Sequence, residues 1–392
     1  MKNKNILISG ASIAGPALAY WLSRYGFNST VVERAPALRD GGYAVDFRGA
    51  AHIRVLERMG ILSAIQRAAT NMSTVSYVDA NNKPLARMPA EMFSGDVEIL
   101  RGDLSHILYN ATKDTTEYIF GDSIASMTET SDGVHVTFAS GTSRTFDLIV
   151  GADGLHSGVR ALIFGDESEF VRYLGYCVAI FTTANHLNLD HTGRYYSVPG
   201  KLVGMYSARH NTEAKALFFF ASPPLDYDYG DIEQQKQILA TTFSGEGWQV
   251  PQLLATMWQA PDFYFDSCSQ ISLDSWSKGR IVLLGDAGYC ASQGGNGTGL
   301  AVVGAYILAG ELAASSGDHR TAFAHYEQQM RPYVKLNQKQ AEGGGKFLVP
   351  GSRSKIWLRN QMFRTLPYLP WKGLIAHMAS KTANAITLKD YG

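Results

Sequence analysis

Cysteine is scarce in this sequence, and neither sign of charge is in excess. Three cysteines, Cys177, Cys268 and Cys290, are spread over 392 residues. This pattern excludes a disulfide framework and a CxxC zinc site, and it is typical of a reducing compartment. Thirty-five basic residues balance thirty-five acidic ones, so the formal net charge is zero. Since nucleic-acid-binding proteins and polybasic membrane-surface proteins carry a basic surplus, neither class is expected.

Long apolar runs and metal-ligand clusters are also missing. The longest apolar run, 300–312, contains Glu311 and is shorter than the ~20 residues that a membrane-spanning helix needs. The apolar stretch near the N-terminus is interrupted by Gly10, Ser12 and Gly15, whose spacing indicates a ligand-binding turn rather than a secretion signal. The histidines are scattered, so we predict no metal site. We expect a cytoplasmic monomer that does not enter a membrane.

Glycine, by contrast, is abundant, and it clusters after short apolar runs that are typical of buried parallel strands. The first such run covers residues 5–9, and helical periodicity over 14–25 leads to a second run at 29–33. This strand–helix–strand order predicts two parallel neighbours, because such crossovers are right-handed. Runs of the same kind at 147–150 and 280–284 predict further strands of this sheet.

The composition shifts in the middle of the chain. From about Tyr173 to Phe265, aromatic and β-branched runs alternate with Gly, Pro and Asn, which predicts an antiparallel sheet. We therefore predict an α/β protein, in which a Rossmann-like domain carries an inserted antiparallel-sheet domain and ends in a C-terminal helical segment, with the glycines at 343–345 as a hinge. The predicted boundaries are 1–172 and 276–342 for the Rossmann-like domain, 173–275 for the substrate-binding domain and 343–392 for the C-terminal helices.

The first functional motif lies between the first strand and the first helix. Gly10, Ser12 and Gly15 stand where dinucleotide-binding proteins carry Gly-x-Gly-x-x-Gly. Glycines there make a tight turn and let the helix amides approach a pyrophosphate. Ser12 replaces the middle glycine, but it is small and carries a hydroxyl that suits a phosphate oxygen. Glu33 closes the second strand, near the ~20-residue spacing expected for the acid that binds a ribose. The alternative is a glycine-rich turn without a ligand.

The second motif follows the strand at 147–150. Asp153, Ser157 and Arg160 are spaced so that they face the same crevice at the end of this strand. An arginine there can hold phosphate groups as a rigid fork. The alternative is an Asp-Gly turn that only starts a helix.

The third motif follows the strand at 280–284. Asp286 comes first, and the glycine-rich loop 294–299 then leads into a long apolar helix. A carboxylate at a strand end suits sugar hydroxyls, and backbone amides before a helix can contact a flat or anionic group. The alternative is a glycine-rich connection with no ligand.

In this order and spacing, the three motifs resemble those of the class A flavoprotein monooxygenases, the family of para-hydroxybenzoate hydroxylase. The resemblance spans nearly the whole chain. It is strongest toward the tetracycline destructases, to which the segments 41–49, 98–104 and 303–312 are similar. It implies FAD as the bound cofactor, NADPH or NADH as a transient reductant, and O2 as a cosubstrate. The chain has no second dinucleotide fingerprint, which matches a family whose NADPH has no Rossmann domain of its own.

The resemblance also implies roles for individual residues. The first motif would hold the FAD pyrophosphate, Glu33 the adenosine ribose, Arg101 the flavin and Asp286 the ribityl chain. Arg39 would receive the nicotinamide cofactor, and the second motif, with Arg160, would serve FAD and NADPH together. The expected cofactor contacts are Gly10, Ser12, Ala14, Gly15, Glu33, Arg34, Arg39, Asp46, Arg101, Asp153, Asp286, Gly297 and Thr298.

One segment departs from the family pattern. Relatives carry a proline in the loop after the Gly-Asp turn, whereas residues 290–297 of this chain have none and are one residue short around Gln293. This loop would lie beside the reactive ring of the flavin, so we expect the surroundings of that ring to differ from those in the relatives.

The flavin carries the chemistry in such enzymes, so we predict no catalytic acid, base or nucleophile from the chain. The main requirement is a dry cavity. Tyr196, Tyr206, Phe218 and Phe220 are expected to face the substrate, although aromatic residues are enriched in any sheet. We expect a monooxygenase that inserts one oxygen atom into an aromatic or polycyclic small molecule, with a tetracycline-like antibiotic, and hence antibiotic resistance, as one candidate.

Three alternatives remain open at this point. A halogenase of this fold carries Trp-x-Trp-x-Ile-Pro, which the nearest string, Trp248–Pro251, does not match. A flavin-dependent reductase would have the same motifs. A non-catalytic flavin- or drug-binding protein is supported only by the altered loop at Gln293, and it would show no substrate-stimulated oxygen uptake.

Overall fold

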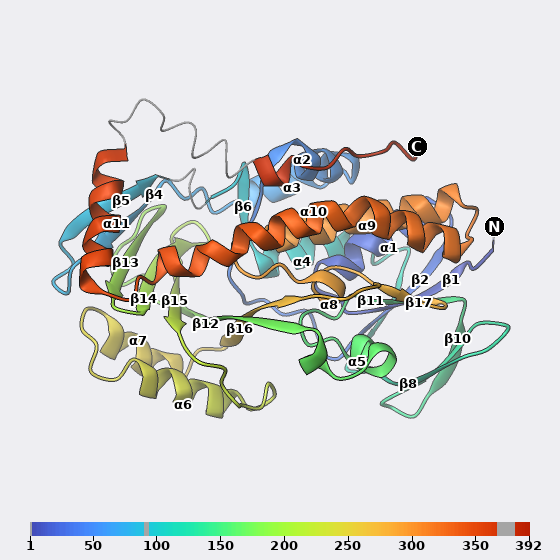
Figure 1. Ribbon diagram of the computed structural model, residues 1–392, viewed down its shortest axis with the longest axis horizontal. Coiled ribbons are helices and arrows are strands. Elements are labelled where there is room, and N and C mark those ends of the chain that lie inside the picture. Colours follow the sequence, from blue (N-terminus) through green and yellow to red (C-terminus); the bar gives the residue numbers. More distant parts are fainter. Residues whose placement is uncertain (1, 90–93, 367–380) are drawn as a thin grey trace.

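The computed structural model of the protein describes residues 2–89, 94–366 and 381–392. Two large sheets dominate the molecule, and a long helix, α10 (His319–Leu348), runs from one to the other (Figure 1). Residues 367–380, which fall within the predicted C-terminal helices, lie outside the described residues. The predicted α/β class, with one mainly parallel and one mainly antiparallel sheet, is confirmed.

The first sheet is the Rossmann-like one, with the strand order β17-β18-β11-β1-β2-β7. Its strands are β1 (Asn5–Ser9), β2 (Asn28–Glu33), β7 (Glu117–Phe120), β11 (Leu148–Gly151), β17 (Ser277–Lys278) and β18 (Ile281–Leu283). All neighbours are parallel except β17 and β18. The apolar runs of β1, β11 and β18 are buried, as expected for strands covered on both faces.

Two helices of the Rossmann-like domain pack against each other, α1 (Ala14–Arg24) and α9 (Gly297–Ala314). By length and composition alone, α9 could cross a membrane, but 78% of it is buried inside the protein, as in the core helix of a globular domain. It is therefore the helix around which this half of the molecule is assembled.

The second sheet is wider than the sequence predicted, with the strand order β16-β12-β15-β14-β13-β4-β5. Its strands are β4 (Thr74–Val78), β5 (Pro84–Pro89), β12 (Val171–Thr183), β13 (Thr192–Val198), β14 (Lys201–Ala208), β15 (Glu213–Ala221) and β16 (Tyr264–Ile271). The hairpin β4–β5 comes from the stretch that we assigned to the first domain, and it joins through a parallel pairing with β13. Helices α6 (Ile232–Thr242) and α7 (Val250–Met257) cover one face of this sheet (Figure 1).

Smaller elements connect the two sheets. A two-stranded antiparallel ribbon, β3 (Ala44–Phe47) with β6 (Val97–Leu100), leads directly into α4 (Arg101–Asn110). The remaining elements are α2 (Gly49–Arg58), α3 (Leu62–Arg67), β8 (Ile124–Glu129), β9 (Val134–Phe138), β10 (Ser143–Phe146), α5 (Gly158–Phe164), the 3-10 helix η2 (Glu167–Glu169), α8 (Asp286–Tyr289) and α11 (Arg353–Thr365).

The glycines at 343–345 lie inside α10 rather than between two elements. The predicted boundary at residue 343 therefore falls within a continuous helix. An added Cβ at Gly343 would meet no atom, whereas one at Gly345 would overlap the ring of Tyr176 on β12. Close packing of the helix on the second sheet thus requires glycine at 345, and it does not require glycine at 343.

Candidate functional site

The three sequence motifs meet at one edge of the Rossmann-like sheet. Strands β1, β11 and β18 are neighbours, so the turns that follow them, which carry Gly10, Asp153 and Asp286, lie side by side. The first two turns touch, because an added Cβ at Gly10 would overlap the carbonyl group of Ala152. The carboxyl edge of a parallel sheet is where folds of this kind bind nucleotides.

The glycine turn has the geometry that a phosphate-binding turn requires. Gly10 has a φ of +108°, and an added Cβ at Gly15 would overlap the carbonyl oxygen of Gly10. Ser12 is half-buried and Ala14 is buried. In the described part of the chain no side chain caps the start of α1, so its first amide groups are left for a ligand.

Glu33 lies at the end of β2, beside this turn. Its carboxylate accepts hydrogen bonds from the backbone N–H groups of Ala11 and Ala35, each at 2.9 Å. Since each carboxylate oxygen has a second lone pair, Glu33 can still accept the hydroxyls of a ribose. Arg34 and Arg39 are exposed, and neither pairs with a carboxylate among the residues described.

Asp153 stabilises the second motif through hydrogen bonds. Its carboxylate accepts from the Ser157 hydroxyl at 2.5 Å, from the Val159 N–H at 3.1 Å and from the Ser9 hydroxyl at 3.4 Å. Burial raises the pKa of Asp153, and the hydrogen bonds from Ser157 and Val159 oppose this rise. The residue thus joins the end of β1 to the start of α5.

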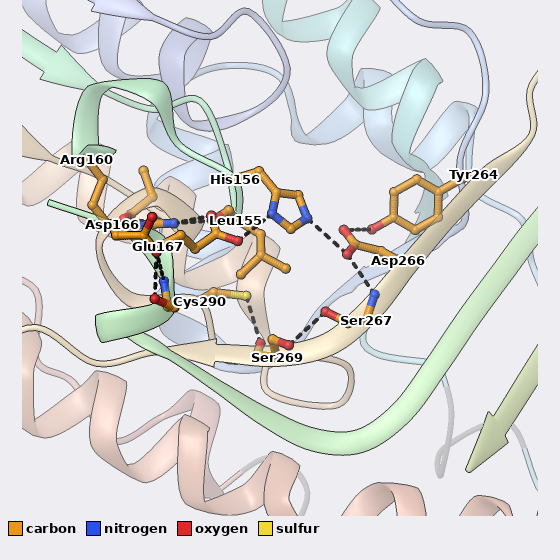
Figure 2. Close-up of polar contacts among 12 residues, drawn as sticks. Leu155, His156, Arg160, Asp166, Glu167, Tyr264, Asp266, Ser267, Ser269 and Cys290 are labelled. Atoms are coloured by element: carbon orange, nitrogen blue, oxygen red, sulfur yellow. Dashed lines mark hydrogen bonds and ion pairs between the residues drawn. The ribbon is translucent and has the colours of Figure 1, made fainter. Parts of the chain in front are cut away.

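Arg160 is fully buried, which corrects the role that the resemblance implied for it. Its Nη1 donates to the carbonyl oxygen of Ala287 at 2.9 Å, and its Nη2 donates to the carbonyl oxygen of Leu155 and to Glu167, both at 2.6 Å (Figure 2). With its guanidinium enclosed, Arg160 cannot contact a transient nucleotide. It joins the second motif to the third from inside the protein.

Asp286 and Arg101 are the charged pair nearest the third motif. Asp286 begins α8, directly after Gly285, which has a φ of +66°. Burial raises the pKa of Asp286, and the positive charge of nearby Arg101 opposes this rise. The Arg101 N–H donates to the carbonyl oxygen of Tyr43 at 3.0 Å, and its guanidinium carbon lies 6.0 Å from the centre of the Tyr43 ring. An acceptor and a cation are therefore available together at the site.

The ribbon β3–β6 adds two acidic residues to the site. Asp46 lies opposite Glu98, forms an ion pair with Arg48, and has its pKa raised by burial. Glu98 accepts a hydrogen bond from Thr70, and burial raises the pKa of Glu98 to about 7. This raised pKa favours the neutral form of Glu98 near neutral pH, which reduces its repulsion of Asp46.

The loop 290–296, which lacks the expected proline, is held in place by α10. Gln338 donates to the carbonyl oxygen of Cys290 at 3.1 Å, and Gln340 donates to that of Gly294 at 2.9 Å. Gln338 and Gln340 were not among the site residues predicted from the sequence, because their contact with the loop is visible only in the structure. Helix α10 thus restrains the loop through these two glutamines.

A small cavity lies between this loop, α10 and the second sheet. Just beyond the loop, Gly297 and Thr298 begin α9. The cavity is lined by Leu174, Tyr176, Phe219, Cys268, Ser292, Gln293, Ala341, Glu342 and Gly345. Three of these nine residues, Ser292, Gln293 and Glu342, are polar, and the volume of about 10 Å³ has room for roughly one water molecule.

Of the four aromatic residues predicted to face the substrate, Tyr206 is on the side of the sheet that meets the ribbon. Its hydroxyl accepts a hydrogen bond from the N–H of Ala44 at 3.2 Å, and burial raises the pKa of Tyr206 well above its usual value. It therefore holds the start of β3 against the second sheet. Phe219 shares this face of the sheet.

The prediction for Tyr196, Phe218 and Phe220 is wrong. The rings of Phe218 and Phe220 lie 4.9 and 5.6 Å from the ring of Phe243, in the core under α6 and α7. Tyr196 stacks on Trp248 at 6.1 Å, on the same side. Because successive side chains of a strand point to opposite faces, an assignment that is off by one residue selects the wrong face.

His52 is a site residue that was not predicted from the sequence. Its Nδ1 accepts from the Arg48 N–H at 3.1 Å, so its Nε2 carries the hydrogen and donates to the Tyr333 hydroxyl at 2.7 Å. The ring also fills the space beside Gly299, where an added Cβ would overlap it. His52 thus connects the segment after Asp46 with the start of α9, and nothing in its sequence surroundings indicates this.

The buried ring of His52 predicts a loss of stability in acid. Burial lowers the pKa of His52 to about 4, from 6.5 for an exposed histidine. The unfolded chain therefore binds this proton first, and the contribution of His52 falls by about 3 kcal/mol as the pH drops from 6.5 to 4. Urea unfolding of the wild type and of His52→Gln across this range checks the prediction.

The pH profiles of the wild type and of His52→Gln must be compared because Glu98 changes the free energy of unfolding with pH in the opposite direction. Its raised pKa makes its own contribution fall as the pH rises through about 7. His52→Gln leaves that effect in place, so its free energy of unfolding should decline less steeply in acid than that of the wild type. Parallel pH profiles for the two proteins would contradict the assignment of a neutral His52.

The chain is similar to known flavoproteins over its full length. The family described as FAD binding domain matches residues 3–341. An uncharacterised protein of Mycobacterium tuberculosis is 47% identical, covering 86% of this chain and 92% of its own. A flavin-dependent monooxygenase of Legionella longbeachae is 41% identical, covering 100% of this chain and 99% of its own. The solved structure of tetracycline destructase Tet(51) matches with a TM-score of 0.87 and 36% identity, covering 100% of both chains.

The geometry at the edge of the Rossmann-like sheet fits the cofactor that these relatives imply. The glycine turn and the uncapped start of α1 suit a pyrophosphate, and Glu33 suits a ribose. Arg101 is near enough to Asp286 for its charge to oppose the rise in the pKa of Asp286, so an acceptor and a cation are present near the third turn. The chain therefore belongs to the FAD-binding-domain family and is a flavin-dependent monooxygenase.

Proposed function

We propose that this protein oxidises a polycyclic aromatic small molecule, with a tetracycline as the first candidate. The observation that carries the proposal is the likeness to tetracycline destructase Tet(51), which extends over both chains completely. The rings of Tyr176 and Phe219, which stack with their centres 5.5 Å apart beside the loop at Gln293, support it, because aromatic faces suit a flat ring system. The reductant is NADPH or NADH, and the oxygen comes from O2.

FAD would lie along the three turns at the sheet edge. The residues proposed to hold it are Gly10, Ser12, Ala14, Gly15, Glu33, Arg34, Asp46, Arg101, Asp153, Asp286, Gly297 and Thr298. Arg39 is exposed next to this set and free of carboxylate partners in the described structure, which supports its proposed role toward the reductant. Asp153 acts mainly through the turn that it braces.

The chain contributes binding, orientation and the exclusion of water. When bound, FAD accepts a hydride from the reductant and supplies the oxygen chemistry. Asp286 offers acceptors for sugar hydroxyls, and Arg101 keeps a positive charge at the same place. Tyr176 and Phe219 keep water from the cavity beside the loop at Gln293. No acid, base or nucleophile of the chain is assigned a covalent step.

Product mass tests this function directly. Protein reconstituted with FAD is incubated with NADPH or NADH, O2 and either a tetracycline, a rifamycin or a simple phenol. The tetracycline should gain one oxygen atom and should accelerate the oxidation of the reductant. Unchanged masses for all three compounds, together with a rate of reductant oxidation that none of them alters, would refute the proposal.

Two neighbouring phenylalanines on opposite faces of β15 provide a matched pair of variants. Phe219→Ala should raise the KM for the substrate about 10-fold, because Phe219 lines the cavity. Phe218→Ala should leave KM unchanged and lower the free energy of unfolding by about 3–5 kcal/mol, because Phe218 is 0% exposed in the core under α6. Steady-state kinetics and urea unfolding of both variants check these results, and equal KM values would place the substrate elsewhere.

We also propose that the protein works as a monomer in the cytoplasm. The zero formal net charge supports the absence of nucleic-acid and membrane partners, since both normally attract a basic surplus. Light scattering after size-exclusion chromatography should give the mass of one chain, 42.8 kDa plus bound FAD. A mass twice as large would show that the protein is a dimer.

A further inference from the structure

His156 lies in the second motif, at the place where the two sheets meet. Figure 2 shows its ring between two carboxylates: Nδ1 is 2.8 Å from Glu167 Oε1, and Nε2 is 3.1 Å from Asp266 Oδ1. Both ring nitrogens face acceptors, and only an imidazolium ion donates from both. Glu167 belongs to η2 beside the Rossmann-like sheet, whereas Asp266 lies on β16 of the second sheet. A single charged ring therefore bridges the two halves of the protein.

The groups around His156 favour this charge. Glu167 also pairs with the buried Arg160, and the Tyr229 ring covers the imidazole with the ring centres 3.7 Å apart. Burial alone would lower the pKa of His156. The hydrogen bonds and charges of Asp266 and Glu167 outweigh it and raise the pKa to about 9. The ring is therefore an imidazolium throughout the neutral range.

A line of contacts leads from His156 to the flavin site. Tyr264 donates a hydrogen bond to Asp266 Oδ2 at 3.1 Å, and burial raises the pKa of Tyr264 far enough that it keeps this proton (Figure 2). The Tyr264 ring lies 5.7 Å from the ring of Tyr43. Tyr43 in turn lies under the guanidinium of Arg101. A continuous line of contacts, through two rings and a carboxylate, therefore connects Arg101 to His156.

We propose that His156 is a positioning residue for the flavin site. The imidazolium holds Asp266, and Asp266 fixes the hydroxyl of Tyr264, so that the Tyr264 and Tyr43 rings keep Arg101 in place to bind the isoalloxazine. Loss of the His156 proton releases Asp266 and loosens both the contact between the sheets and the flavin site. The inference rests on the proposed function only for the contact between Arg101 and FAD.

FAD titrations of two histidine variants test this inference. His156→Gln keeps the size of the side chain and one donor group, but it removes the charge. His135→Gln is the matched control, because the exposed His135 on β9 has Thr145 as its hydrogen-bond partner and no carboxylate partner in the described structure. We expect His156→Gln to weaken FAD binding about 3- to 10-fold at pH 7 and to shift the visible absorption of the flavin, while His135→Gln matches the wild type.

The pH profile separates positioning from simple structural support. The wild type should lose FAD affinity between about pH 8 and pH 10, as His156 releases its proton, whereas His156→Gln should have no such step. The free energy of unfolding without FAD gives a second readout. A raised pKa in the folded state contributes fully below pH 6.5 and is lost as the pH rises through about 9, so the wild type should decline more than His156→Gln over this range.

Tyr264→Phe completes the experiment, because it removes the hydroxyl and leaves the ring. It should weaken FAD binding as His156→Gln does, while the unfolding profile above pH 6.5 stays like that of the wild type. Wild-type FAD affinity in His156→Gln overturns the inference, and if that variant does not fold, wild-type affinity in Tyr264→Phe does so. FAD titration needs no substrate, so a failure of the oxygenation assay would refute the proposed function and leave this result standing.

Discussion

Gly15→Ala is expected to abolish the retention of FAD by the purified protein. The added methyl group would overlap the carbonyl oxygen of Gly10, and relief of that overlap must open the turn or move α1 away from β1. Either movement displaces the amide groups that meet the pyrophosphate. We expect the FAD dissociation constant to rise about 100-fold, which corresponds to ~3 kcal/mol of lost binding. Visible absorption after desalting, followed by FAD titration, measures this effect.

Gly343→Ala is the matched control for this substitution. It adds the same methyl group at a helical glycine where the Cβ meets no atom. FAD content should stay at the wild-type level, and helix propensity favours alanine by about 1 kcal/mol. A Gly15→Ala protein that retains FAD as well as Gly343→Ala does would show that the glycine turn is not where the pyrophosphate binds.

Arg160→Met is expected to lower the free energy of unfolding by about 3–5 kcal/mol. Methionine has a similar length, but it leaves Glu167 and the carbonyl oxygens of Leu155 and Ala287 without their donor. Because these bonds tie α5 to α8, the variant should also bind FAD less tightly than its stability alone requires. Urea unfolding of the FAD-free protein, followed by circular dichroism, gives the stability change.

Arg172→Met shows how much an exposed arginine contributes to the free energy of unfolding in the same protein. Its ion pair with Glu342 is exposed on both sides, and such pairs contribute about 0–1 kcal/mol. The difference between the two arginine variants should therefore exceed about 2 kcal/mol. Similar unfolding midpoints would mean that Arg160 is replaceable and that another contact holds the second and third motifs together.

Features that depend on the local backbone could be predicted from the sequence. The turns at Gly10 and Gly285 require glycine because of positive φ values or close approaches, and such requirements are visible in the sequence within a few residues. Buried parallel strands leave continuous apolar runs, so β1, β11 and β18 were recognisable. The resemblance of the three motifs, in their order and spacing, to those of the class A flavoprotein monooxygenases then predicted that they meet at one site.

Features that depend on long-range contacts were not recognisable. The parallel pairing of β4 with β13 has no local signature, so the second sheet was predicted too narrow. The face of β15 depends on where α6 and α7 pack, which decided between Phe218 and Phe219. Arg160 and His52 look like ordinary polar residues in the sequence, and their importance arises only from partners that lie far along the chain.

The strand order also determines when the nucleotide-binding sheet is completed during synthesis. Its central strand β11 needs β18 on one side and β1 on the other, and β18 is translated only after the whole second sheet. Since the loop that closes the β11–β18 pair is long, this pairing contributes to slow folding. On the ribosome, the inserted sheet is thus available to fold first, and the nucleotide-binding sheet that carries the FAD turns is completed last.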